Sequence, residues 1–171
     1  SEMCIRDRDY EALRTLTAEQ QRHFRIPDAA PEGRYRADFD ALMGPMIHNE
    51  AAPSPAGKKV GKAGPSEPPA MDEAEKQVRL DARFRTMQLW DWTMAESITR
   101  ALESGHRPVV HIEGRFHSDF IGGTPQAVVK LRPGTNIVII SVVDAASDVL
   151  REEDRGRGDF IVYVGEEKQG K

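Results

Sequence analysis

A short stretch in the middle of the sequence, VVHIEGRFHSDFIGG (residues 109–123), combines side chains that can do chemistry with a break in structure. An apolar run ends at Glu113, Gly114 allows the backbone to turn sharply, and His117 follows three residues later. Alternation along a strand places His111 on the same face as Glu113. A carboxylate and an imidazole at the carboxyl end of a strand can form part of a metal site, a general acid–base pair or a contact to a haem edge.

Neighbouring residues extend this candidate site. Asp119 is expected to add a second carboxylate, and the glycines at 122–123 open a segment that resembles a helix start able to receive an anion. The alternative is that Glu113 and His117 only cap loop amides or pair in solvent, because motifs of this length recur by chance. For His111 the alternative is packing under a helix with one ring nitrogen hydrogen-bonded.

Asp91 lies in the strongest helical signal, residues 71–105, which has no internal glycine or proline and closes on a glycine suited to a C-cap. The predicted apolar stripe of this helix consists of Phe84, Met87, Trp90, Met94, Ile98 and Leu102. Asp91 falls within the stripe, and a buried carboxylate is costly unless it is paired or hydrogen-bonded. We therefore expect another group to meet Asp91, either at a functional site or as a partner from a neighbouring helix.

Two weaker helical patterns precede the long helix. Residues 9–24 and 34–49 are predicted helices, the second ended or kinked at Gly44–Pro45, and they suggest a helical subdomain over residues 9–48. The second helix is expected to place four apolar residues on one side: Tyr35, Phe39, Leu42 and Met43. Residues 49–70 hold five prolines and one branched apolar residue, which predicts a disordered insertion.

Three runs rich in valine and isoleucine follow the long helix, at residues 108–114, 136–143 and 159–164. Such runs suit a parallel sheet covered on both faces, and the segment between the first two has the length of a short crossover helix. The sequence therefore predicts an α/β fold, a mostly parallel sheet flanked by helices with a helical subdomain. Three strands make a thin sheet for this much helix, so we expect amino-terminal strands to be missing.

Composition excludes several function classes. A formal net charge of -4 without a long basic run argues against nucleic acid as a partner. No window approaches the roughly 18 apolar residues of a membrane span. Cys4 is the only cysteine, which excludes an intramolecular disulfide and a thiolate metal cage. It lies in residues 1–8, SEMCIRDR, which resemble translated sequencing-adapter sequence; we interpret them as an artefact and expect a natural amino terminus, with any signal or lipid-anchoring cysteine, to be lost.

Two motifs resemble the ChaN-like haem-binding uptake proteins, which share a superfamily with the Tiki proteases and erythromycin esterases. MQLWDWTMAESI (residues 87–98) is similar to their Trp-Asp-x-x-Met-Ala helix, and EGRFHSDFIGGTPQAV (residues 113–128) is similar to their strand-Gly-x-x-His-loop-Gly element. The resemblance covers residues 71–143, with a weaker continuation to Val164, and identifies residues 71–171 as a partial domain, the carboxy-terminal half of the family. The family's first motif, a strand followed by Gly-Glu-x-His, is absent from the sequence.

The resemblance implies binding of haem or iron during bacterial uptake, by a periplasmic or membrane-anchored lipoprotein. It places His117, Gly114, Asp91 and Glu113 at the cofactor site with His117 as metal ligand, although Glu113 stands where the family commonly has a small residue. Imidazole or tyrosinate would ligate haem iron between apolar walls.

The superfamily's enzymatic branches imply an alternative, a hydrolase dependent on a divalent metal. In it, His117 and Glu113 would serve as ligand or base and Asp91 would support them. Two further possibilities stay open: a homodimer, and a truncated domain that packs but has no activity alone.

Overall fold

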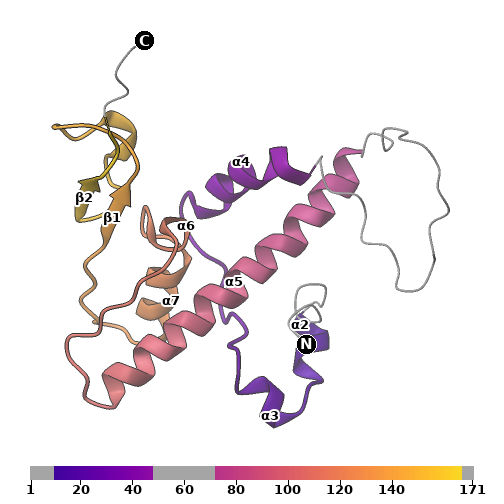
Figure 1. Cartoon of the computed structure of the whole chain (residues 1–171). Coiled ribbons are helices and arrows are strands. Elements are labelled where there is room, and N and C mark those ends of the chain that lie inside the picture. The colour runs from indigo at the N-terminus through magenta and orange to yellow at the C-terminus, as the bar shows by residue number, and fades with distance from the viewer. Residues whose placement is uncertain (1–9, 48–71, 167–171) are drawn as a thin grey trace, which may run out of the picture.

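The computed structural model describes residues 10–47 and 72–166, and the structural statements below concern these residues (Figure 1). The predicted insertion at residues 49–70 and the interpreted artefact at residues 1–8 lie outside the described part. The elements in chain order are α2 (Tyr10–Arg14), α3 (Ala18–Gln21), α4 (Tyr35–Ile47), α5 (Glu73–Glu103), α6 (Arg115–Ser118), α7 (Gly123–Leu131), β1 (Ile140–Val143), the 3-10 turn η1 (Glu152–Asp154) and β2 (Phe160–Tyr163).

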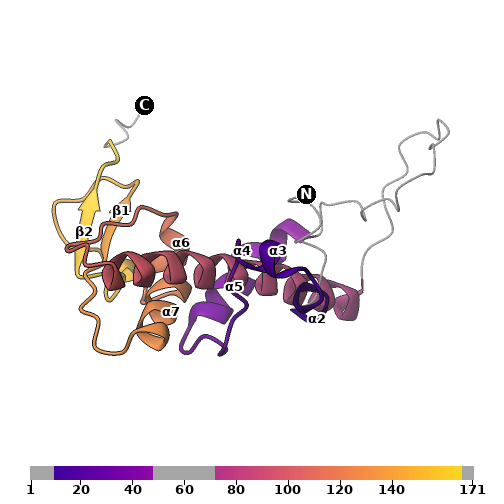
Figure 2. The same ribbon diagram turned by 90° about the horizontal axis from the view of Figure 1, so that it is seen from below.

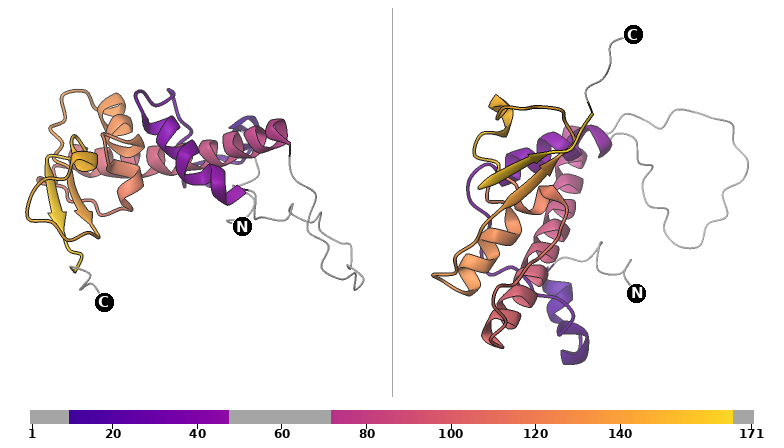
Figure 3. Two further views of the ribbon diagram at one scale, coloured as in Figure 1. Left: turned by 90° about the horizontal axis from the view of Figure 1, so that it is seen from above. Right: turned by 60° about the vertical axis from the view of Figure 1, so that its left-hand side comes forward.

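Helix α5 is the axis on which the other elements are arranged. Figure 2 shows α2, α3 and α4 along its first half and α6, α7 and the two strands along its second half. Figure 3 shows α4 and α7 one after the other beside α5, and these two helices make the main helix–helix contacts of the described chain. None of the described helices combines the length and the apolar content needed to cross a membrane.

The long predicted helix is confirmed, with both of its ends. The side chain of Asp72 caps the start by accepting a hydrogen bond from the backbone N–H of Glu75, and Gly105 follows the end with a φ of 87°. The predicted stripe is wrong in part, because Trp90 is 44% exposed. The middle of α5 carries apolar residues on two sides, so periodicity alone does not fix its phase. The buried residues are Leu80, Phe84, Gln88, Leu89, Asp91, Trp92, Ala95 and Thr99.

The two helices predicted before α5 differ from the structure in detail. The first is divided into α2 and α3, because Thr17 forms a capping box with Gln20 and starts a new helix. The second, α4, continues through Pro45 to Ile47. Leu42 is 47% exposed and does not share the buried side of α4 with Tyr35 and Phe39 as predicted.

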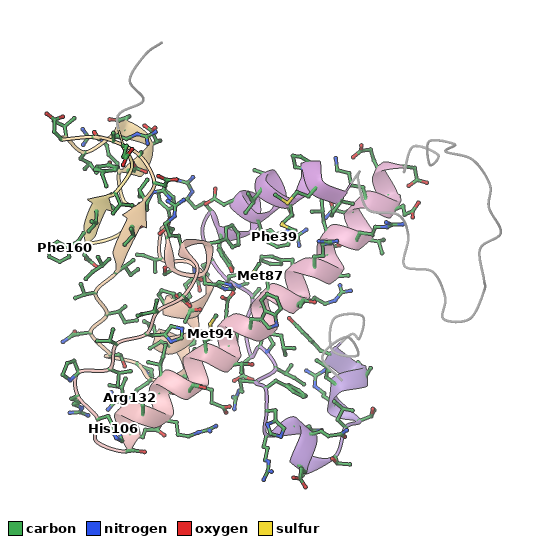
Figure 4. All side chains as sticks on the ribbon, viewed as in Figure 1. Phe39, Met87, Met94, His106, Arg132 and Phe160 are labelled. Carbon is green, nitrogen blue, oxygen red and sulfur yellow. The ribbon has the colours of Figure 1, made fainter. Side chains whose placement is uncertain are left out.

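Two apolar clusters lie along α5. The first joins α4 to α5 through Tyr35, Phe39, Ile47, Leu80 and Phe84, and Figure 4 shows Phe39 between the two helices. The second joins α5 to α7 through Trp92, Ala95, Ala127 and Val128. Asp91 lies between Phe84 and Trp92 on α5, so this carboxylate is placed between the two clusters.

The predicted parallel pairing is confirmed, but the sheet is small. β1 and β2 pair in parallel with Ile140 opposite Phe160. The helix predicted before β1 is present as α7, but it joins no two described strands and so is not a crossover. The predicted strand at residues 108–114 is wrong: in the described part of the chain this segment has no strand partner. A β-strand forms only where its backbone can hydrogen-bond to a neighbouring strand, and an apolar composition does not provide that neighbour.

One face of the two strands is not covered by the described residues. Figure 4 shows Phe160 pointing away from the helices, and Figure 1 places the helices on the other side of the strands. Large apolar residues on this outer sheet face are 42% to 64% exposed: Val138, Ile140, Val142, Phe160, Val162 and Val164. Val110 and Ile112, in the unpaired segment, are 82% and 90% exposed.

Candidate ligand-binding site

The buried carboxylate of Asp91 is the centre of the candidate site. Asp91 is 1% exposed, and its Oδ2 accepts a hydrogen bond of 2.8 Å from the Tyr35 hydroxyl. Its Oδ1 accepts one of 3.2 Å from the Thr124 hydroxyl and one of 2.6 Å from His117 Nδ1. The expectation that another group meets Asp91 is confirmed, and the donors come from α4, α6 and α7.

The first turn of α7 is built around this carboxylate. A Cβ on Gly123 would lie 1.9 Å from Asp91 Oδ2, so only glycine allows the helix backbone to approach so closely. A Cβ on Gly122 would lie 2.8 Å from the backbone oxygen of His117. The positive end of the helix dipole favours an anion at this place, and in this structure the anion is the chain's own Asp91.

The imidazole of His117 is held in one orientation. A carboxylate only accepts hydrogen bonds, so Nδ1 carries a proton, and Nε2 presents its lone pair when the imidazole is neutral. No described residue forms a hydrogen bond with Nε2, and the side chain of His117 is 15% exposed. Burial by itself would lower the pKa of His117, but the hydrogen bond to Asp91 and the negative charges of Asp91 and Glu113 outweigh it and raise the pKa. The exposed ring of Trp90 lies 6.4 Å from the imidazole, between ring centroids.

The side chain of Glu113 is 9% exposed and lies close enough to Asp91 and His117 for their charges to act on it. Its Oε2 is 3.3 Å from His111 Nε2, yet no described group makes a hydrogen bond of ordinary geometry with this oxygen. Burial raises the pKa of Glu113, and Thr124 and the two histidines offset part of that rise.

The structure therefore brings together the four residues predicted for the cofactor site. Asp91, Glu113 and His117 form the polar group, and Gly114 is the N-cap residue of α6, where a Cβ would lie 3.8 Å from His117 Cδ2. His111 reaches only the outer side of this group, with its side chain 33% exposed.

Asp119 is not part of the site, so the expected second carboxylate is wrong. Its Oδ1 accepts a 2.7 Å hydrogen bond from the Ser141 hydroxyl, and its Oδ2 pairs with Arg157 at 2.5 Å. Phe120 and Ile121 both adopt a φ of 56°, which reverses the chain between Asp119 and α7. Asp119 consequently joins the loop to β1 and to the segment before β2.

Sequence reasoning missed Tyr35 and Thr124 as members of the site. Tyr35 was predicted only as an apolar face residue of its helix. Burial and the neighbouring Asp91 charge raise the pKa of Tyr35 far above its ordinary value, so the phenol stays protonated and donates to Asp91. This argues against Tyr35 as the tyrosinate ligand of a haem.

The donor set suits an axial ligand of haem iron. In the described parts of the chain, no group of three or more His, Cys, Asp or Glu side chains converges as a metal cage would require. One imidazole, with a carboxylate behind Nδ1 and a free Nε2, is the arrangement that proteins use for a single strong nitrogen ligand.

Fold and site define a class of protein: an α/β domain in which a buried carboxylate on a helix holds a partly buried imidazole by a hydrogen bond. Residues 3–128 match the family described as haem-binding uptake, Tiki superfamily, ChaN, and the chain belongs to this family. The match confirms the resemblance over residues 71–128 and also includes residues 9–70, which the sequence motifs did not cover. It does not include residues 129–164, so the resemblance predicted there stays a prediction. No curated protein and no solved structure matches the chain. That the chain corresponds to the carboxy-terminal half of the family stays a prediction.

The raised pKa of His117 predicts a pH-dependent stability. The protonated imidazole is favoured in the folded state, so its stabilisation is complete below the ordinary pKa of 6.5 and is lost as the pH rises through the raised value. We expect the free energy of unfolding of the wild type to fall over this interval relative to that of His117→Gln. Urea titrations at a series of pH values measure the difference, and parallel curves for the two proteins would contradict the prediction.

Proposed function

We propose that this protein binds haem at His117, whose Nε2 would hold the iron. The observation that carries the proposal is the 2.6 Å contact of Nδ1 with buried Asp91, which leaves Nε2 free among the described residues. A carboxylate behind an imidazole fixes the ring and makes it a stronger donor. Bound haem supplies an iron centre that accepts this lone pair.

Three further observations support the proposal. Trp90, beside His117, offers a flat apolar surface that is 44% exposed, of the kind that lines haem sites. Glu113 Oε2, close to His117, is a buried polar atom to which no described group donates a hydrogen bond of ordinary geometry. The family to which the chain belongs is described by haem-binding uptake. A role in bacterial iron uptake, in the periplasm or at a membrane as a lipoprotein, is part of the same proposal and is supported by that description alone.

A haem titration followed by visible absorbance tests the proposal. We expect a saturable Soret change in the wild type and binding at least about tenfold weaker in His117→Ala, a difference of about 1.4 kcal/mol. His106→Ala is the matched control, because His106 follows the carboxyl end of α5 and its Nδ1 lies 3.2 Å from the backbone oxygen of Ala101 (Figure 4). Equal haem affinity in the wild type and both variants would mean that haem binds at another place. No Soret change in the wild type would contradict the proposal outright.

A metal-dependent hydrolase is the second candidate function. The specific observation in its favour is the His117–Asp91 pair beside Glu113, since a braced imidazole can also act as a general base and a carboxyl with a raised pKa as an acid. Zinc-dependent turnover of an ester or peptide, lost in His117→Ala and accompanied by no haem binding, would favour this candidate over the first.

We also propose that the domain contains further strands, encoded upstream of residue 1. The uncovered outer sheet face and the unpaired segment at residues 108–114 support this, because parallel sheets are normally covered on both faces. The upstream reading frame would then encode a strand followed by a second Gly-x-x-His type motif. A frame without such an element would contradict this part of the proposal.

A further inference from the structure

We infer that Tyr35 is a positioning residue that sets how strongly His117 can donate to a ligand, acting through the shared carboxylate of Asp91. The inference rests on the proposed function for the nature of the ligand, but its structural part does not require haem. Tyr35 begins α4, fifty-six residues before Asp91 in sequence, and its hydroxyl donates to Oδ2 over 2.8 Å.

The carboxylate links the two side chains electronically. Asp91 is 1% exposed, so described protein donors take the place that water would otherwise have around its oxygens. Every hydrogen bond that a carboxylate accepts withdraws negative charge from it, and such networks are coupled more strongly in a low-dielectric interior. The Tyr35 hydroxyl therefore reduces the charge available to the proton on His117 Nδ1. Its removal is expected to shorten and strengthen the bond between Asp91 and His117.

The aromatic ring of Tyr35 has a separate, packing role. Its centroid lies 5.8 Å from that of Phe84 and 5.2 Å from that of Phe116, the residue before His117. A phenylalanine at position 35 would keep these ring contacts. Tyr35→Phe consequently removes the hydrogen bond to Asp91 and little else, which makes the electronic role separable from the packing role.

The position of Tyr35 gives the segment before α4 an influence on the site. Glu32 is tied to α7 by a 2.7 Å hydrogen bond from its backbone N–H to Gln126 and by a 3.0 Å ion pair with Lys130. These contacts hold the start of α4 against the helix that carries Thr124. The contacts that hold Glu32 against α7 therefore also help to position the Tyr35 hydroxyl that donates to Asp91.

Proton NMR of the ligand-free protein tests the inference through the resonance of the His117 Nδ1 proton. We expect this resonance to move downfield in Tyr35→Phe, because the hydrogen bond to Asp91 becomes stronger. Tyr163→Phe is the matched control, since its hydroxyl donates to Asp154 over 2.8 Å and does not touch Asp91. A purely structural role would leave the resonance in place or move it upfield, and either result would overturn the inference.

Thr124→Val provides a second variant should Tyr35→Phe fold poorly, because it removes the other hydroxyl donor to Asp91 and predicts the same downfield direction. In the haem-loaded protein, Tyr35→Phe is expected to lower the midpoint reduction potential, since a more basic imidazole favours ferric iron. Absence of haem binding would sink the proposed function and still leave the NMR result to decide the role of Tyr35. An unchanged potential in a haem-loaded variant would count against the inference.

Discussion

Replacing Asp91 with alanine is expected to reduce the free energy of unfolding by about 3–5 kcal/mol, a large part of the 5–15 kcal/mol typical of a whole domain. The carboxylate is fully buried and accepts hydrogen bonds from Tyr35, Thr124 and His117. Its removal leaves all three donors without their acceptor at the junction of α4, α5 and α7. Urea denaturation monitored by circular dichroism measures the loss.

Two further variants sharpen this prediction. Asp91→Asn keeps the volume and one oxygen acceptor but loses the charge, so we expect a smaller loss of stability together with a weaker hold on His117. Asp148→Ala removes an exposed aspartate and is expected to change stability by less than about 0.5 kcal/mol. If Asp91→Ala were as mild as Asp148→Ala, the carboxylate would not be the centre of the site.

Gly123→Ala is expected to be the second severe change. The added Cβ would lie 1.9 Å from Asp91 Oδ2, 2.4 Å from Asp91 Cγ and 2.9 Å from a ring carbon of Tyr35. Asp91 cannot move aside without breaking its hydrogen bonds, so α7 must shift away from α5. Overpacking of this kind costs about 1–3 kcal/mol, and lost hydrogen bonds add to it.

Gly44→Ala is the matched control for the change at Gly123, and the two are compared in the same thermal or urea unfolding experiment. Gly44 lies inside α4, and a Cβ there would meet its nearest neighbour, Lys76 Cε, at 4.0 Å. Alanine in a helix interior is favoured over glycine by about 0.5–1 kcal/mol, so this variant is expected to be more stable than the wild type. Equal stability of the two variants would mean that α7 does not start against Asp91.

Sequence patterns predicted the helices and strands whose ends are set by residues close to them in the sequence. The long helix carries its own cap at Asp72 and its own stop at Gly105, so its bounds could be anticipated. The apolar runs at residues 136–143 and 159–164 predicted the two strands that pair as β1 and β2, and the segment before the first run predicted helix α7. The position of Asp91 among the apolar residues of α5 predicted that its carboxylate is buried, and a buried carboxylate needs a hydrogen-bond partner.

Features that depend on distant contacts could not be predicted in the same way. Tyr35 meets Asp91 across fifty-six residues, and no spacing rule connects them. The only available signal was that a buried carboxylate needs a donor and that Tyr35 is an aromatic residue with a hydroxyl on the apolar side of its helix. Asp119 looked equivalent to Glu113, but its carboxylate bonds to Ser141 and Arg157, which are 22 and 38 residues away in the sequence.

The proposed role of His117 as the iron ligand, held by Asp91, is tested most directly by rescue of His117→Gly with free imidazole. This variant removes the side chain and leaves a space beside Asp91 that imidazole can enter. We predict that it binds haem weakly, and that added imidazole restores the affinity and the Soret position of the wild type. Wild-type haem affinity in His117→Gly without imidazole would contradict the claim.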